Sequence, residues 1–173
     1  MSPHSRLERI LCIGEVYASA IPLELRTLLG SCVAVCLFDP VARAGGMNHF
    51  ALPDEPDGAA ATPVARFGLP AMLELLDRLR AVGGIHQRLL ATIIGGGHLL
   101  SATDVVNGVA RRNVAFARSF LGDVRIAIVA EDVGGHHARQ VRFHTDTGGI
   151  QVAPVETAAS RARSSIIRGA RHG

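Results

Sequence analysis

The feature that most constrains the fold is a pair of apolar segments separated by a turn signal. Cys32–Phe38 (CVAVCLF) is a short apolar run of strand-forming residues, which predicts a buried β-strand. Asp39-Pro40 is typical of a turn, and Gly45–Leu52 (GGMNHFAL) predicts a returning strand. The two segments therefore predict an antiparallel hairpin.

Two helices are predicted after this hairpin. Pro70–Val82 is the clearest, because Pro70 suits a first helical position and Gly83 suits the residue after the last turn. Its predicted apolar stripe consists of Met72, Leu73, Leu76 and Leu79. Val109–Leu121 has the same amphipathic pattern and predicts the second helix.

Strands outnumber helices in the pattern of the chain. Ile21–Leu29 is interpreted as a connecting stretch, and Pro53–Pro63 as a polar loop. The further predicted strands are Arg9–Val16, Arg88–Ile94, Val124–Ala130, and a hairpin of Gln140–His144 with Ile150–Val155. This mixture predicts an α/β layered sandwich with mostly antiparallel or mixed sheets and two main helices, forming one domain over residues 1–156. Residues 157–173 form an Arg/Ala/Ser-rich tail.

Composition and charge exclude several classes of protein. Of the 173 residues, 48% are hydrophobic and 19% charged, which is typical of a globular chain and not of a disordered one. No apolar run approaches the roughly 20 residues of a membrane span, and the polar N-terminus lacks the apolar core of a secretory signal. We therefore expect a cytoplasmic protein without membrane insertion. The net charge of +3 invites a nucleic-acid interpretation, but aromatic residues are only 4% and no dense basic block occurs, so no nucleic-acid partner is expected.

The three cysteines, Cys12, Cys32 and Cys36, do not form a disulfide or metal pattern. An odd number of cysteines in a chain without a signal argues against a disulfide framework. Cys32 and Cys36 have no second pair with which to complete a zinc site. We expect no metal and no cofactor, and for Cys12 and Cys36 the usual place of a free cysteine, the core.

Cys32 has a different setting, because Gly30 and Ser31 lead directly into it at the mouth of an apolar strand. Backbone amides at such a junction can bind an oxyanion, and a neighbouring imidazole can activate the thiol. A turn centred on Pro40-Val41 would place Cys32 opposite His49, and a looser turn would make the two diagonal neighbours. A slip of one residue would put them on opposite faces of the sheet. A cysteine in an apolar strand is otherwise simply a core residue.

LGSCVAVCLFDP (Leu29–Pro40) followed by GGMNHFALP (Gly45–Pro53) resembles the signature of the CheD family of chemoreceptor glutamine deamidases. Segments in the same order and spacing extend the resemblance over most of the chain, from about Leu11 to Val155. They are IIGGGHLL (Ile93–Leu100), NGVARRN (Asn107–Asn113) and EDVGGHHARQVRFHTDTGG (Glu131–Gly149).

The resemblance implies a Cys–His amidohydrolase, related in fold to bacterial toxin deamidases, that converts glutamine side chains of methyl-accepting chemotaxis receptors to glutamate. Cys32 matches the nucleophile and His49 the general base, and amides near Gly30 and Ser31 would hold the oxyanion. The family's threonine stands six positions before the cysteine, where this chain has Arg26, with Thr27 one position later. Either Thr27 or another group orients the imidazole.

The same resemblance implies two further possibilities. The machinery that cleaves a glutamine amide can also hydrolyse a glutamyl methyl ester, because only the leaving group differs. An alternative to catalysis is an adaptor role in chemotaxis, in which the chain binds a receptor or a CheC-type phosphatase. That role predicts binding that survives Cys32→Ala.

Overall fold

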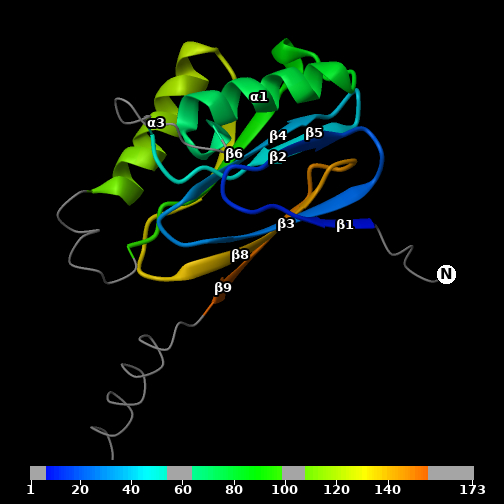
Figure 1. The fold of residues 1–173 in the computed structure, drawn as a ribbon. Helices are drawn as coiled ribbons and strands as arrows, with labels where there is room; N and C mark the ends of the chain where they lie inside the picture. Colours follow the sequence, from blue (N-terminus) through cyan, green and yellow to red (C-terminus); the bar gives the residue numbers. More distant parts are fainter. Residues whose placement is uncertain (1–6, 54–63, 99–107, 156–173) are drawn as a thin grey trace, which may run out of the picture.

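The computed structural model describes residues 7–53, 64–98 and 108–155. Its architecture has three layers: two helices, a five-stranded sheet below them and a four-stranded sheet below that (Figure 1). The order of strands is β2-β5-β4-β6-β7 in the five-stranded sheet and β1-β3-β8-β9 in the four-stranded one. Each sheet contains one parallel pair among antiparallel ones, which confirms the predicted layered α/β sandwich with mixed sheets.

The first part of the chain differs from its prediction. The single strand expected over Arg9–Val16 is two strands in different sheets, β1 (Leu7–Ile10) and β2 (Val16–Ser19). They are separated by a turn in which Gly14 has φ 82°, a left-handed conformation that glycine adopts without strain. The predicted connection over Ile21–Leu29 was also wrong, because Leu23–Leu29 is strand β3 of the four-stranded sheet.

The central hairpin is present as predicted. It pairs β4 (Val33–Asp39) with β5 (Ala44–Asn48), and Cys36 lies opposite Met47. An isolated bridge between Val33 and Phe50 continues the same register beyond β5. The hairpin therefore holds Cys32 and His49 at one end of the sheet.

The remaining strands complete the two sheets close to where the sequence predicts them. Strand β6 (Leu90–Gly95) pairs with β4 and with β7 (Ala127–Val133) in the five-stranded sheet. Strands β8 (Ala138–His144) and β9 (Ile150–Val155) form the predicted second hairpin, in the four-stranded sheet. The bounds of β6 and β7 lie a few residues later than predicted.

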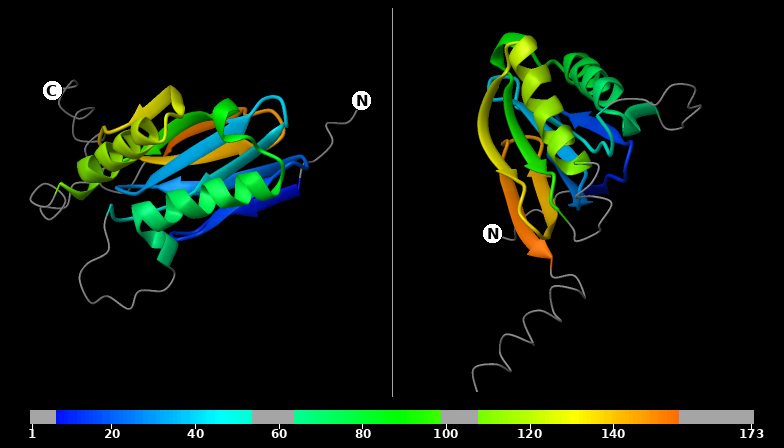
Figure 2. Two further views of the ribbon diagram at one scale, coloured as in Figure 1. Left: turned by 90° about the horizontal axis from the view of Figure 1, so that it is seen from above. Right: turned by 90° about the vertical axis from the view of Figure 1, so that its left-hand side faces the viewer.

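Both helices, α1 (Gly68–Ala81) and α3 (Val109–Asp123), cross the same face of the five-stranded sheet (Figure 2). The apolar stripe predicted for α1 was wrong in part, because Leu73 is 50% exposed. The residues that α1 buries are Gly68, Ala71, Met72, Leu75 and Leu79. Within the described ranges, no helix is long and apolar enough to cross a membrane.

The core has two parts, one on each face of the five-stranded sheet. Val33, Val35 and Leu37 of β4 point toward the helices. Ala34 and Cys36 alternate with them and point toward the four-stranded sheet. Side chains on the second face of β4 are therefore enclosed between the two sheets, and that face carries the candidate site. The Pro53–Pro63 loop, apart from Pro53, and the tail from Thr157 lie outside the described residues.

Candidate active site

Cys32 lies where the connection from β3 enters β4. Its side chain is half-buried and packs against the core between the two sheets. Burial raises the pKa of the Cys32 thiol, against the smaller opposing effects of a backbone hydrogen bond and of the Arg66 charge. The resting thiol is therefore neutral near pH 7, and a base must take its proton before it can act as a nucleophile.

His49 follows β5 directly and belongs to the same face of the sheet as Cys32. The Val33–Phe50 bridge places Ala51 across from Cys32, so His49 is its diagonal neighbour and not its direct partner. Diagonal neighbours on one face are separated by roughly 7–8 Å between backbone positions, which leaves their side chains within reach of each other. Of the registers that the sequence allows, the structure has the diagonal one.

Thr27 brings the opposite sheet into contact with His49. Its Oγ1 lies 2.8 Å from His49 Nδ1 and donates its hydrogen to the carbonyl of Leu11 at 2.7 Å. A hydroxyl has a single hydrogen, so Oγ1 can only accept from His49 and Nδ1 must carry the ring proton. Nε2 then keeps a free lone pair, which is the form of imidazole that a general base requires.

The ring of His49 is enclosed, with only 3% of the residue exposed. Burial lowers the pKa of His49 to about 4, although a backbone hydrogen bond to Leu11 and the charge of Glu15 act in the opposite direction. His49 Nε2 is buried, and it has no hydrogen-bond partner among the described residues. The imidazole is therefore neutral at pH 7, and its one basic nitrogen is not engaged elsewhere.

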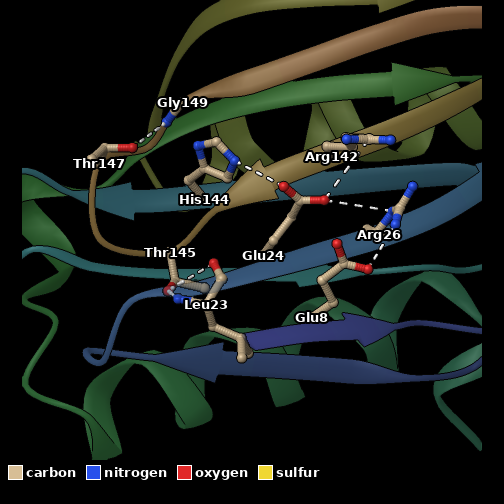
Figure 3. A network of polar contacts seen from close by, with 9 residues as sticks. All are labelled: Glu8, Leu23, Glu24, Arg26, Arg142, His144, Thr145, Thr147 and Gly149. Carbon is tan, nitrogen blue, oxygen red and sulfur yellow. Dashed lines mark hydrogen bonds and ion pairs between the residues drawn. The ribbon is translucent and has the colours of Figure 1, made fainter. Parts of the chain in front are cut away.

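Arg26, which has the spacing of the family's threonine, lies on the other face of β3. Its guanidinium bonds Glu8 at 2.7 Å and approaches Glu24 at 3.5 Å, in a polar network on the outer face of the four-stranded sheet (Figure 3). Strand alternation explains the difference, since Leu25, Thr27 and Leu29 are the buried residues of β3. Of the two neighbouring residues, Thr27 is the one that contacts His49.

The backbone around Gly30 and Ser31 is held by the glycine loop that follows β6. The amide of Gly97 donates to the carbonyl of Gly30 at 2.9 Å, and that of Gly96 to the carbonyl of Cys32 at 2.8 Å. These bonds use carbonyls and leave the amides of Ser31 and Cys32 without an acceptor in another described residue. The Cys32 amide contacts only its own sulfur. Amides that are not committed to other residues and lie beside a thiol are what an oxyanion site needs.

Gly95, the last residue of β6 before that loop, permits close approach of two backbones. A Cβ on Gly95 would lie 2.2 Å from the carbonyl oxygen of Cys32, and Gly95 has φ 115°. Only glycine fits at such a position. A second glycine pair, Gly134-Gly135, follows β7 and contacts the end of β6. The amide of Gly134 donates to the carbonyl of Gly95 at 3.0 Å. The loops are thus structural supports of the Cys32 backbone.

Asn113 is a polar residue of the site whose role the sequence did not reveal. It comes from α3, is fully buried, and its Nδ2 donates to the carbonyls of Ser31 at 3.1 Å and Ala51 at 3.0 Å. One side chain thus ties the residue before Cys32 to the segment that follows His49. The only signal in the sequence was its place in the NGVARRN segment, which gives no indication of the partners.

The other candidate groups contribute no site of their own. All three cysteines are free; Cys36 is buried and Cys12 is exposed, contrary to the core position expected for Cys12. Within the parts of the chain that the structure describes, no group of three or more His, Cys, Asp or Glu side chains could hold a metal ion.

The fold and these contacts define a class: a layered α/β protein that carries a half-buried thiol, a buried imidazole and a buried hydroxyl on the facing surfaces of its two sheets. The chain belongs to the CheD family, whose model, described as CheD chemotactic sensory transduction, matches residues 51–154.

Curated relatives agree with this assignment. The chain is 42% identical over 148 residues to a protein of Burkholderia thailandensis named "Probable chemoreceptor glutamine deamidase CheD 1", covering 84% of this chain and 63% of the relative. It is 44% identical over 141 residues to a protein of Burkholderia vietnamiensis named "Probable chemoreceptor glutamine deamidase CheD", covering 80% of this chain and 57% of the relative. The chain thus spans about three fifths of the length of these relatives.

Proposed function

We propose that this chain is a cysteine-dependent amidohydrolase that deamidates glutamine side chains in the cytoplasmic helices of chemotaxis receptors. The observation that carries the proposal is the contact between Thr27 and His49. It fixes the imidazole with its unprotonated nitrogen free, on the sheet face that also carries the Cys32 thiol. The names of the Burkholderia relatives support the choice of substrate.

The first half of the reaction forms a thioester. His49 Nε2 takes the proton of Cys32 Sγ, and the thiolate attacks the side-chain carbonyl carbon of the glutamine. The amides of Ser31 and Cys32 stabilise the negative oxygen of the tetrahedral intermediate. His49 returns its proton to the departing nitrogen, the C–N bond breaks, and ammonia leaves a glutamyl thioester on Cys32.

The second half restores the protein. His49 takes a proton from water, and the hydroxide attacks the thioester carbonyl. The C–S bond breaks, the sulfur recovers the proton from His49, and glutamate is released. A glutamyl methyl ester would follow the same two steps with methanol as the leaving group in place of ammonia. No metal or redox partner is required by this sequence of bonds.

The proposal is tested by mass spectrometry of receptor cytoplasmic fragments before and after incubation with the protein. A mass gain of about one dalton at a glutamine, together with released ammonia, is the expected result. Cys32→Ala and His49→Ala should abolish both, and Cys12→Ala should not. If wild type and Cys32→Ala bind receptor fragments or a CheC-type phosphatase equally and neither changes their mass, the adaptor role replaces the enzymatic one.

A further inference from the structure

The turn before β2 contacts His49 directly. The amide of Gly14 donates to the carbonyl of His49 at 2.7 Å, and the amide of His49 donates to the carbonyl of Glu15 at 3.1 Å. The register of β2 with β5 places Val16 opposite Asn48, so the preceding residue, Glu15, comes opposite His49. Residues opposite each other in an antiparallel pair share a face, and Glu15 therefore lies on the same face as the imidazole.

The carboxylate of Glu15 closes the turn that precedes it. Its Oε2 accepts the amide hydrogen of Cys12 at 2.7 Å, and the amide of Glu15 donates to the carbonyl of Cys12 at 3.0 Å. The residue before Cys12 is Leu11, whose carbonyl accepts the Thr27 hydroxyl. A continuous path of short contacts thus leads from Glu15 through the turn and Thr27 to His49 Nδ1.

The charge of Glu15 also acts on the imidazole. It raises the pKa of His49, against the larger lowering effect of burial. The two other side chains of the candidate site, the Thr27 hydroxyl and the Cys32 thiol, are uncharged in the resting state. The nearby cation, Arg66, acts on Cys32. Glu15 is thus the described charged group that opposes the cost of placing a proton on a buried ring.

We propose that Glu15 is a positioning residue for His49, which orients the ring through the Cys12 turn and stabilises its imidazolium form during proton transfer. This inference rests on the proposed amidohydrolase function. When His49 holds the proton of Cys32 or of water, a positive charge exists in an enclosed site, and the Glu15 carboxylate is the matching negative charge. The residue touches neither substrate nor thiol and acts only through the imidazole.

Glu15→Gln removes the negative charge but keeps the turn, because the amide oxygen of glutamine can still accept the Cys12 amide hydrogen. We expect kcat to fall roughly tenfold for each pKa unit that His49 loses, with KM unchanged. The acid limb of the rate profile should move to lower pH. Glu15→Asp keeps the charge and should retain more activity than Glu15→Gln. Glu74→Gln, which removes an exposed carboxylate of α1, is the matched control and should behave as wild type.

Titration of the His49 ring followed by NMR provides a readout that does not depend on catalysis. In Glu15→Gln the ring should remain neutral to a lower pH than in wild type, whether or not the protein turns over a receptor fragment. An unchanged midpoint together with an unchanged kcat would overturn the role of Glu15. If the midpoint shifts in Glu15→Gln but the wild-type protein shows no deamidase activity, the proposed function is rejected and the electrostatic contact between Glu15 and His49 remains.

Discussion

Thr27 Oγ1 and His49 Nδ1 are 2.8 Å apart, although Thr27 lies in β3 of the four-stranded sheet and His49 directly follows β5 of the five-stranded sheet. The contact exists because β3 and β5 face each other across the inner layer of the sandwich. It makes the orientation of the imidazole depend on the packing of the two sheets and not on a local loop alone.

Removing this hydroxyl should disable the site with little change of shape. In Thr27→Val, the Leu11 carbonyl and the His49 Nδ1 hydrogen both lose a buried partner, which costs about 1–3 kcal/mol for each group. We expect kcat to fall roughly 10- to 100-fold, because the ring loses its orientation and its tautomer. Steady-state kinetics of ammonia release measures the effect. Thr27→Ser keeps the hydroxyl and should retain most activity; an equal loss in both variants would contradict the role of the hydrogen bond.

The pH dependence of the reaction should be unusually broad on the acid side. The proposed base is active only when neutral, and burial lowers the pKa of His49 to about 4. The value of kcat/KM should therefore stay level as the pH falls below 6.5 and decline only as it passes through about 4. On the alkaline side, the raised pKa of Cys32 extends the plateau beyond the ordinary thiol range. An acid limb centred near 6.5 would show that His49 is not buried as described.

Alkylation by iodoacetamide tests the same charge state without a substrate. A neutral thiol beside a neutral imidazole should react slowly at pH 6, and its rate should rise only as Cys32 ionises at high pH. A thiolate–imidazolium pair would already react fast at pH 6. Cys12 is exposed and will react as well, so the rate should be measured in a Cys12→Ser background.

Asn113 should be needed for both stability and turnover. Asn113→Ala removes the donors to the carbonyls of Ser31 and Ala51, which remain in a buried region. We expect a loss of about 2–3 kcal/mol in the free energy of unfolding, measured by urea denaturation, and a lower kcat in the fraction that stays folded. Arg112→Ala, which changes the exposed neighbour on α3, is the control. If Asn113→Ala loses stability but keeps the wild-type kcat, the role of Asn113 is structural and does not extend to turnover.

Strand periodicity explains how much of the site could be predicted from the sequence. Cys32 and His49 belong to one hairpin, so a period of two and a short turn restrict them to a few registers. The choice between Arg26 and Thr27 could have been made in the same way. Leu25, Thr27 and Leu29 alternate with Glu24, Arg26 and Leu28, and recognising Leu23–Leu29 as a strand would have placed Thr27 on the face opposite the two charged residues.

The contacts of Asn113 and Glu15 could not be predicted in this way. The Asn113 bonds span 82 and 62 residues and depend on where α3 crosses the sheet. Glu15 lies opposite His49 because the predicted first strand is interrupted at Gly14. A single glycine in an apolar stretch is a weak sequence signal for such an interruption. Long-range packing, and not local pattern, determines both contacts.

Asp39 is a buried charged residue at the turn end of the β4–β5 hairpin, away from the candidate site. Its fully buried carboxylate accepts hydrogen bonds from Arg88 and from the amides of Val41, Ala42 and Ile85. Burial alone would raise the pKa of Asp39, but the Arg88 guanidinium and the three amides together hold it well below its usual range. The carboxylate therefore contributes its full stabilisation at pH values above about 3.9, and this contribution declines progressively as the pH falls from there through the lower pKa of the folded state.

Asp39→Asn should thus lower the free energy of unfolding by about 3–5 kcal/mol at pH 7, because it removes one partner of a buried pair. The difference between variant and wild type should shrink as the pH falls below about 3.9, because the unfolded wild-type chain then binds a proton at Asp39 while the folded chain does not. Urea denaturation at pH 7 and pH 3 measures both values. The specific activity of the folded variant should remain near that of wild type, since Asp39 lies at the turn end of β4 and Cys32 precedes its other end. A stability difference that is the same at both pH values would mean that the carboxylate charge contributes nothing.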